Sequence, residues 1–273
     1  MSVNRMNATQ VYDCPSSLSE EDPGPVLIHN PGCGRGLLVI ADHAGNAVPA
    51  AMNNLGLEND DLVRHIAWDP GAALVATELA TRLRATAVLS QYSRLIVDPN
   101  RPLGDTSSMP QVSDGIAVPA NADLSEQERV RRAKLFYWPY HVAVSQEMAR
   151  LCMEGEGPLL VSIHSFTPDF GEEDRSWHIG VMSAADRRLG DAVIAGLKKC
   201  GDYNVGDNQP YSGIEYGYTL KVHAAAQGLA NVQIEIRQDL LADQAGVRRW
   251  VDVLETVLTP LINDLSLRSI MHH

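Results

Sequence analysis

Two short segments place a histidine after a run of apolar residues, and this feature constrains the fold more than any other. Residues 37–41 (LLVIA) precede His43, and residues 159–161 (LLV) precede His164. Short apolar runs of this kind are typical of buried strands. Because ligands bind at the carboxyl ends of the strands in open α/β sheets, we expect both histidines at one sheet edge. Catalytic zinc usually takes three protein ligands, so two histidines at that edge indicate a possible zinc site.

The rest of the chain alternates predicted strands with predicted helices, which favours an α/β fold with a largely parallel sheet. Asp69 is a candidate N-cap for a helix that begins at Pro70, and Ser125 opens a capping box with Glu128. Further strands are expected at about 87–92, 178–182 and 232–236, and helices at about 58–67, 70–84, 125–153, 187–199, 218–228 and through 247–258. Residues 1–35 are expected to form an irregular N-terminal arm, and residues 36–273 a single domain.

Composition excludes several classes of protein. Apolar residues make up 45% and charged residues 21% of the chain, as is usual for globular proteins. The net charge of −12 argues against a nucleic-acid partner. No apolar run is long enough to predict a membrane span. Residues 1–22 lack the apolar core of a secretory signal, and four scattered cysteines are typical of reduced thiols, so we expect a cytoplasmic protein. The sequence does not indicate an oligomeric state.

Four motifs occur in the order seen in N-formylglutamate amidohydrolases, which this chain resembles over about residues 36–260. They are DHAGN at 42–46, SRLIVDPNR at 93–101, IHSF at 163–166 and QIEIRQDL at 233–240. The resemblance implies a three-layer α/β/α fold of the phosphorylase/hydrolase type, with a largely parallel mixed sheet, similar to zinc carboxypeptidases and zinc-dependent cell-wall amidases. It also implies hydrolysis of an amide on an acidic amino acid. The usual first motif is Pro-His-Ser-Gly, and Asp42 stands here in place of the proline.

Three residues compete for the position of third zinc ligand. In carboxypeptidases a glutamate follows the first histidine by three positions, but here that residue is Asn46, and an amide is a poor zinc ligand. Cell-wall amidases instead take a carboxylate from the start of the next helix, where Asp69 lies, although helix capping would use the same oxygens. His65 is a weaker substitute. The predicted metal ligands are therefore His43, Asp69 and His164.

Glu235 is the predicted catalytic residue. Polar and apolar residues alternate in VQIEIR at 232–237, so Gln233, Glu235 and Arg237 would share one face of a strand. A half-solvated edge strand would give the same pattern. A late strand that delivers a carboxylate to a metal site also suits the general base of amide hydrolysis, and the resemblance implies such a group at this place.

An acidic substrate needs a local positive site in a protein of net charge −12. Arginine is suited to this because its planar guanidinium can bind a carboxylate through two hydrogen bonds. A structural ion pair is the alternative for each arginine, and for Arg94 the partner would be Asp98. A core or surface position is the alternative for the histidine of this group. The predicted substrate-binding residues are Arg94, Asn100, Arg101, His223 and Arg237.

The expected function is zinc-dependent hydrolysis of a small anionic N-acyl amino acid. The preferred substrate is N-formyl-L-glutamate, which would give formate and L-glutamate. A peptidase or a cell-wall amidase on the same framework is the alternative enzyme. A non-catalytic protein that binds acidic ligands and has lost its metal is the alternative outside enzymes, and Asn46 is the residue that favours it.

Overall fold

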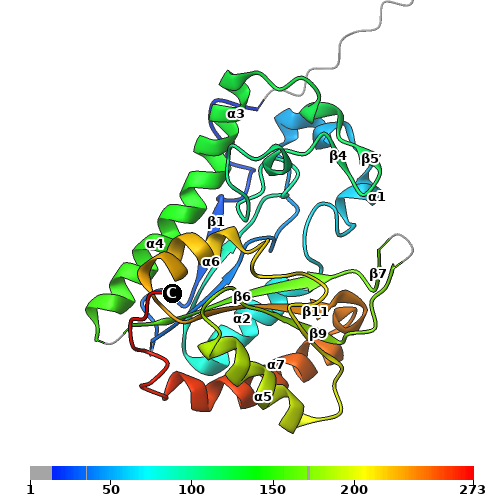
Figure 1. Cartoon of the computed structure of the whole chain (residues 1–273). Coiled ribbons are helices and arrows are strands. Elements are labelled where there is room, and N and C mark those ends of the chain that lie inside the picture. Colours follow the sequence, from blue (N-terminus) through cyan, green and yellow to red (C-terminus); the bar gives the residue numbers. More distant parts are fainter. Residues whose placement is uncertain (1–13, 35, 156, 171–172) are drawn as a thin grey trace, which may run out of the picture.

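A central mixed sheet organises the protein (Figure 1). The computed structural model describes residues 14–34, 36–155, 157–170 and 173–273. Within these residues, seven strands form one sheet in the order β1–β3–β2–β6–β11–β9–β10. Neighbours among β3, β2, β6 and β11 are parallel, whereas β1 is antiparallel to β3 and β9 is antiparallel to β11. The bounds are β1 Val26–His29, β2 Leu37–Ala41, β3 Thr86–Ser90, β6 Leu159–Phe166, β9 Ile179–Met182, β10 Val205–Asp207 and β11 Asn231–Arg237.

Helices cover both faces of the sheet and confirm the three-layer α/β/α prediction (Figure 1). On one face lie α2 (Ala72–Leu83), α5 (Arg188–Cys200) and α7 (Gln244–Ile262). On the other face lie α4 (Trp138–Met153) and α6 (Tyr218–His223). The apolar stripe expected along the last helix is buried against the sheet, including Trp250 and Leu254. No helix in the described part of the chain is both long and apolar enough to span a membrane. All four cysteines are free thiols.

The segments that follow β2 and β3 build a second, smaller core of short elements, which includes Met52, Tyr92 and Phe136. The helix α3 (Glu126–Arg132), a π-helical segment (Ala133–Tyr137) and α4 follow one another directly, as the predicted helix at 125–153 requires. The other short elements are α1 (Asn59–Leu62), β4 (Val112–Ser113), β5 (Ile116–Ala117) and the 3-10 helices Ala50–Gly56, Thr106–Ser108 and Pro119–Asn121. Elsewhere lie the hairpin β7 (Asp169–Phe170) and β8 (Glu173–Asp174) and the 3-10 helices Ala225–Gln227 and Gln238–Leu241.

The structure corrects several expectations about local structure. Part of the supposedly irregular arm is a strand, because β1 pairs with β3 as an edge of the sheet; residues 1–13 and 35 of the arm lie outside the described residues. The strand β10 was not anticipated. The helix expected at 58–67 shortens to α1, and the one expected at 218–228 divides into α6 and a 3-10 turn.

The two helix starts that the sequence indicated differ in outcome. Ser125 caps α3 as predicted, because its side chain accepts a hydrogen bond from the backbone N–H of Glu128. The carboxylate of Glu128 does not complete the capping box, but accepts from the backbone N–H of Cys14 at 2.9 Å. The prediction that Asp69 caps the next helix is wrong. The residue before α2 is Gly71, with a φ of 83° and no side-chain cap, which leaves the carboxylate of Asp69 free for another role.

The order of strands places a topological switch point between β2 and β6. From β2 the chain passes to β3 on one side, and it later returns to β6 on the other side of β2. Crevices at the carboxyl ends of strands at such a point are the usual ligand sites of open α/β sheets. His43 follows β2 and His164 lies within β6. The fold therefore brings both histidines to this crevice.

Candidate metal centre and catalytic pocket

Asp69 lies between the imidazoles of His43 and His164. Its Oδ2 atom is 2.7 Å from Nδ1 of His164 and 3.3 Å from Nδ1 of His43. All three side chains are buried, and one donor atom from each lies within 4.8 Å of the others. In a tetrahedral zinc site with bonds of 2.0–2.2 Å, donor atoms lie about 3.3 Å apart. The cluster is therefore compact enough to surround a zinc-sized cation.

Each histidine of this cluster also contacts a second carboxylate through its other ring nitrogen. Nε2 of His43 lies 2.8 Å from Oδ1 of Asp98, and Nε2 of His164 lies 2.9 Å from Oδ2 of Asp42. When Nε2 carries the proton, it donates to the carboxylate and the lone pair of Nδ1 faces Asp69. Metal-binding histidines are usually held in this way. The donor set and its outer carboxylates therefore fit a bound metal.

The electrostatics of the cluster favour a cation. Burial would raise the pKa of Asp42, but the hydrogen bond and charge of His164 lower it to about 2. Burial likewise opposes ionisation of Asp98 and Asp69, yet neighbouring His43 and Arg94 help to hold both pKa values well below the usual range. For His164, burial would lower the pKa, but the hydrogen bonds to Asp42 and Asp69 raise it well above its ordinary value. The negative charge that favours a proton here also favours a metal cation.

Hydrogen bonds from one strand, β6, and one helix, α6, hold Asp42 in place. Its carboxylate accepts from the hydroxyl of Ser162 on β6 at 2.9 Å and from the hydroxyl of Thr219 on α6 at 2.5 Å. Ser162 and His164 lie on the same face of β6 because the strand continues to Phe166 and alternate residues of a strand share a face. The sequence analysis gave Asp42 no role, since its partners are far away in the chain. In the sequence, only the replacement of the usual proline by Asp42 indicated that this residue could have a role in the site.

The loop that carries His43 packs tightly against the end of β3. A Cβ atom on Gly45 would lie 2.1 Å from the carbonyl oxygen of Gln91, so only glycine allows this approach. The loop is then tied to the neighbouring segments by two backbone hydrogen bonds, from Ala47 to Gln91 at 3.2 Å and from Ser93 to Ala47 at 2.9 Å. A third, from Asp69 to the carbonyl of His43 at 2.9 Å, joins two members of the cluster directly.

Glu235 is buried and lines the cavity beside the cluster. The strand β11 lies between β6 and β9, in register such that Glu235 is beside His164. Its carboxylate accepts a hydrogen bond from the side-chain amide of Gln233 at 2.7 Å. Burial raises the pKa of Glu235, and the negative charge of Asp69 adds to this. The alternation of β11 therefore reflects a polar face turned toward the cavity, and not an edge strand in water.

The inner cavity beside the cluster has a volume of about 140 Å³. Its lining contains the three predicted metal ligands and Glu235, together with residues that the sequence analysis did not identify as part of the site. It is formed by His43, His65, Asp69, Arg94, Asn100, Arg101, His164, Ser165, Met182, Tyr211, Tyr216, Gln233 and Glu235.

The three arginines predicted to bind substrate lie in different environments. Arg94 lines the inner cavity but bridges two carboxylates, Asp69 and Asp98, at 3.2 Å each. Arg101 also lines the cavity, and its guanidinium lies 4.9 Å from the ring centre of Tyr216. No ion pair joins it to a carboxylate in the described part of the chain. Arg94 therefore makes the ion pairs expected of a structural arginine. The guanidinium of Arg101 donates to the backbone carbonyl of Asn100 at 3.3 Å and has no carboxylate partner among the described residues.

Arg237 and His223 lie outside the lining of the inner cavity. Arg237 pairs with Asp239, with Nε 2.8 Å from Oδ1. His223 stacks on His141, with Nε2 of His223 2.8 Å from Nδ1 of His141. Burial lowers the pKa of His223 to about 4. The other nitrogen of His141 is 3.0 Å from the carbonyl of Pro99, so this pair supports the loop between Asp98 and Asn100 and does not face the cavity.

Three further candidates occupy distinct positions. Asn100 lines the inner cavity, and its side-chain oxygen accepts from the backbone N–H of Thr219 at 3.0 Å. His65 also lines the cavity, with Nδ1 3.4 Å from Oδ1 of Asp69, and burial lowers its pKa to about 4. Asn46 donates to the carbonyl of Leu62 at 2.9 Å and is not part of the cluster. The cluster is therefore assembled without Asn46.

Comparison with known proteins identifies the family. The model of the N-formylglutamate amidohydrolase family matches residues 35–242. The chain belongs to the N-formylglutamate amidohydrolase family. The matched range contains every member of the cluster as well as Glu235. Membership in this family places the chain among hydrolases of amide bonds.

Two solved structures resemble this member of the family. A gene product of Agrobacterium tumefaciens has 35% sequence identity and a TM-score of 0.86, covering 91% of this chain and 99% of that chain. The N-formylglutamate amidohydrolase from Ralstonia eutropha JMP134 has 19% identity and a TM-score of 0.64, covering 88% of this chain and 98% of that chain. The second likeness concerns the fold alone. Comparison with curated proteins gives no significant match.

The outer carboxylate on His164 gives a first prediction. Replacing Asp42 by Asn should weaken zinc binding by about 10–100-fold, the usual effect of losing such a partner, because the imidazole is no longer held with Nδ1 toward the metal. Zinc affinity is measured by competition with a coloured chelator. The matched control is Asp186→Asn, since Asp186 is also buried and pairs with Arg188 at 2.7 Å away from the cluster. Equal zinc affinity in the Asp42 variant and the parent would contradict this assignment.

Proposed function

We propose that this family member is a zinc-dependent amidohydrolase that cleaves N-formyl-L-glutamate to formate and L-glutamate. The observation that supports it best is the buried donor set of His43, Asp69 and His164, with outer carboxylates on both histidines and Glu235 in the same cavity. The alternative of a binding protein that has lost its metal rested on Asn46. It loses that support because the donor set does not include Asn46.

The metal would be held by Nδ1 of His43, Nδ1 of His164 and the carboxylate of Asp69. Zinc in such a position supplies Lewis-acid activation of water and of the scissile carbonyl. The chain contributes the orientation of the donors, because Asp98 and Asp42 fix the two imidazoles from behind. Arg94 restrains Asp69 in turn through its bond to Oδ1, which leaves Oδ2 facing the two histidines.

Glu235 is the proposed general base. It would take a proton from the attacking water and later deliver it to the leaving amine, so that water and the amide yield formate and free glutamate. A raised pKa suits both steps, because a base whose pKa is closer to the working pH can also return the proton. The amide of Gln233 holds one carboxylate oxygen, and this fixes the plane of the carboxylate beside the cluster.

Arg101 is the proposed partner of a substrate carboxylate. Its guanidinium lines the cavity without an ion pair in the described residues, and the ring of Tyr216 supports it from one side. Asn100 lines the same wall and is fixed by Thr219. The positive charge of Arg101 therefore meets the requirement for a local cationic site in an acidic protein.

The activity itself is the direct test. Protein stripped with a chelator should release no formate from N-formyl-L-glutamate, and one equivalent of zinc per chain should restore the reaction. His43→Ala and His164→Ala should each bind no zinc and show no activity while the fold is retained, as judged by circular dichroism. Full activity in protein that elemental analysis shows to be free of metal would refute the mechanism.

Glu235→Gln separates a base from a ligand. The substitution keeps the shape of the side chain but removes its basicity, so kcat should fall by about 10²–10⁴-fold while zinc content stays at the parental level. Glu147→Gln is the control, because Glu147 is a partly buried carboxylate that pairs with Arg150 away from the cavity. Loss of zinc in the Glu235 variant would make Glu235 a ligand, and an unchanged kcat would remove it from the catalytic machinery.

Arg101→Lys tests the substrate contact. An ammonium cannot form the paired hydrogen bonds of a guanidinium, so KM for N-formyl-L-glutamate should rise about tenfold, with a smaller change for the neutral analogue N-formyl-L-glutamine. The matched control is Arg237→Lys, which alters an arginine that pairs with Asp239 outside the cavity. Equal rises in KM for the charged and the neutral substrate would show that Arg101 is structural.

A further inference from the structure

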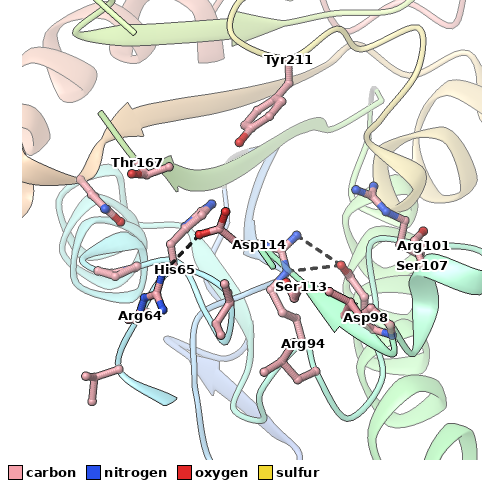
Figure 2. Close-up of a pocket in the computed structure, with 17 residues that line it drawn as sticks. Arg64, His65, Arg94, Asp98, Arg101, Ser107, Ser113, Asp114, Thr167 and Tyr211 are labelled. Atoms are coloured by element: carbon pink, nitrogen blue, oxygen red, sulfur yellow. Dashed lines mark hydrogen bonds and ion pairs between the residues drawn. The ribbon is translucent and has the colours of Figure 1, made fainter. Parts of the chain in front are cut away.

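A larger cleft opens next to the inner cavity. Its volume is about 630 Å³, within the range of about 300–1,000 Å³ that is common for sites of larger organic ligands. Figure 2 shows this outer cleft, with Tyr211 and Thr167 on one side and Arg94 and Asp98 on the opposite side. A formyl group has a single carbon atom, so its hydrolysis does not account for a cleft of this size.

The outer cleft and the inner cavity share four residues, and we call this shared boundary the throat. The throat consists of His65, Arg94, Arg101 and Tyr211. In Figure 2 the hydroxyl of Tyr211 points into the cleft from the segment that precedes α6. Because the metal cluster and Glu235 line the inner side of the throat, a substrate whose amide lies at the cluster can extend through the throat into the outer cleft.

The two spaces differ in chemistry. Apart from Met182, the inner cavity is lined by polar, charged and aromatic side chains. The outer cleft has a mixed lining, in which charged and polar residues such as Arg64, Ser113 and Asp114 stand beside aliphatic ones. The aliphatic residues, which we call the aliphatic wall, are Val63, Ile66, Pro70, Leu95, Pro110 and Val112. A charged amino acid therefore suits the inner cavity, and an apolar group can contact the aliphatic wall, which has no counterpart there.

We propose that the outer cleft binds the acyl group of the substrate, and that the preferred substrates are N-acyl-L-glutamates with an uncharged aliphatic acyl chain of several carbons. This inference rests on the proposed function and widens its acyl group beyond formyl. The reaction is unchanged in its balance: water adds, the amide C–N bond breaks, and the products are a carboxylic acid and glutamate.

The charges around the throat favour an uncharged acyl group over an N-terminal amino-acid residue. In a dipeptide the α-ammonium would lie one carbon from the scissile carbonyl. It would therefore sit at the throat, which Arg94 and Arg101 help to form. The carboxylates that line the outer cleft are already paired, Asp98 with Arg94 at 3.2 Å and Asp114 with Arg64 at 3.3 Å. An ammonium at the throat would therefore lie beside the guanidinium groups of Arg94 and Arg101, and the carboxylates of the outer cleft are already held by arginines.

Three substrates test the proposal on the zinc-loaded enzyme. N-acetyl-L-glutamate is the short reference, since its carbonyl carries an alkyl group as the longer chains do. N-(4-methylpentanoyl)-L-glutamate should have a kcat/KM at least about tenfold higher, because burying about two methylene groups corresponds to a factor of this size. L-leucyl-L-glutamate differs from it only by the amino group, and its kcat/KM should be at least about tenfold lower.

A matched pair of valines locates the binding site of the acyl group. Val112 lines the outer cleft and is 58% exposed, whereas Val130 on α3 lines neither space and is 56% exposed. Val112→Glu should remove most of the preference for 4-methylpentanoyl over acetyl, since a carboxylate replaces part of the aliphatic wall. Val130→Glu should keep the parental ratio.

The outcomes separate this inference from the proposed function. If N-formyl- and N-acetyl-L-glutamate are hydrolysed but the longer chain gives an equal or lower kcat/KM, the outer cleft does not bind the acyl group and the proposed function stands. If the dipeptide equals its deaminated analogue, the argument from charge is wrong. If the zinc-loaded protein hydrolyses none of the N-acylglutamates, both proposals fall. The comparison of substrates on the parent decides the matter even if Val112→Glu does not fold.

Discussion

The contact of one carboxylate with two imidazoles, Asp69 with His43 and His164, is the interaction on which the site depends. Burying an ionised carboxylate is costly unless charged or hydrogen-bonded partners compensate for it. Here three carboxylates, those of Asp42, Asp69 and Asp98, are buried close together. The two histidines and Arg94 lie between them and bond to them, which offsets the repulsion of their charges. The loop after β2, the segment before α2 and the loop after β3 supply these groups, with His164 from β6, and lie together at the site.

The main features of the fold were predictable because buried parallel strands read as continuous apolar runs. This explains why β2 and β6, and with them His43 and His164, could be placed from the sequence. The edge strand β1 was missed because only four residues between prolines form it. The capping role of Asp69 was wrong because a local signal, an aspartate before a proline, competed with contacts to distant histidines that the sequence cannot show.

The outer carboxylates and the paired arginines could not be predicted for a similar reason. Asp42 lies next to His43 in the sequence but bonds to His164, whose partner is set by the order of strands in the sheet. Arg94 and Arg101 lie in one motif, yet only the fold reveals that the first is held by two carboxylates and the second is not. The pattern of β11 was equally consistent with an edge strand, and its position between two strands decided the question.

The late position of β11 in the chain has a consequence for synthesis on the ribosome. The proposed metal donors lie between residues 43 and 164, whereas Glu235 follows about seventy residues later on a strand between β6 and β9. Chains are synthesised from the N-terminus. The strands β2, β3 and β6 and all three proposed donors are thus synthesised before Glu235. The pairing of β11 with β6, which sets Glu235 beside His164, therefore cannot precede the synthesis of the three proposed donors, and it is the last contact needed to assemble the proposed site.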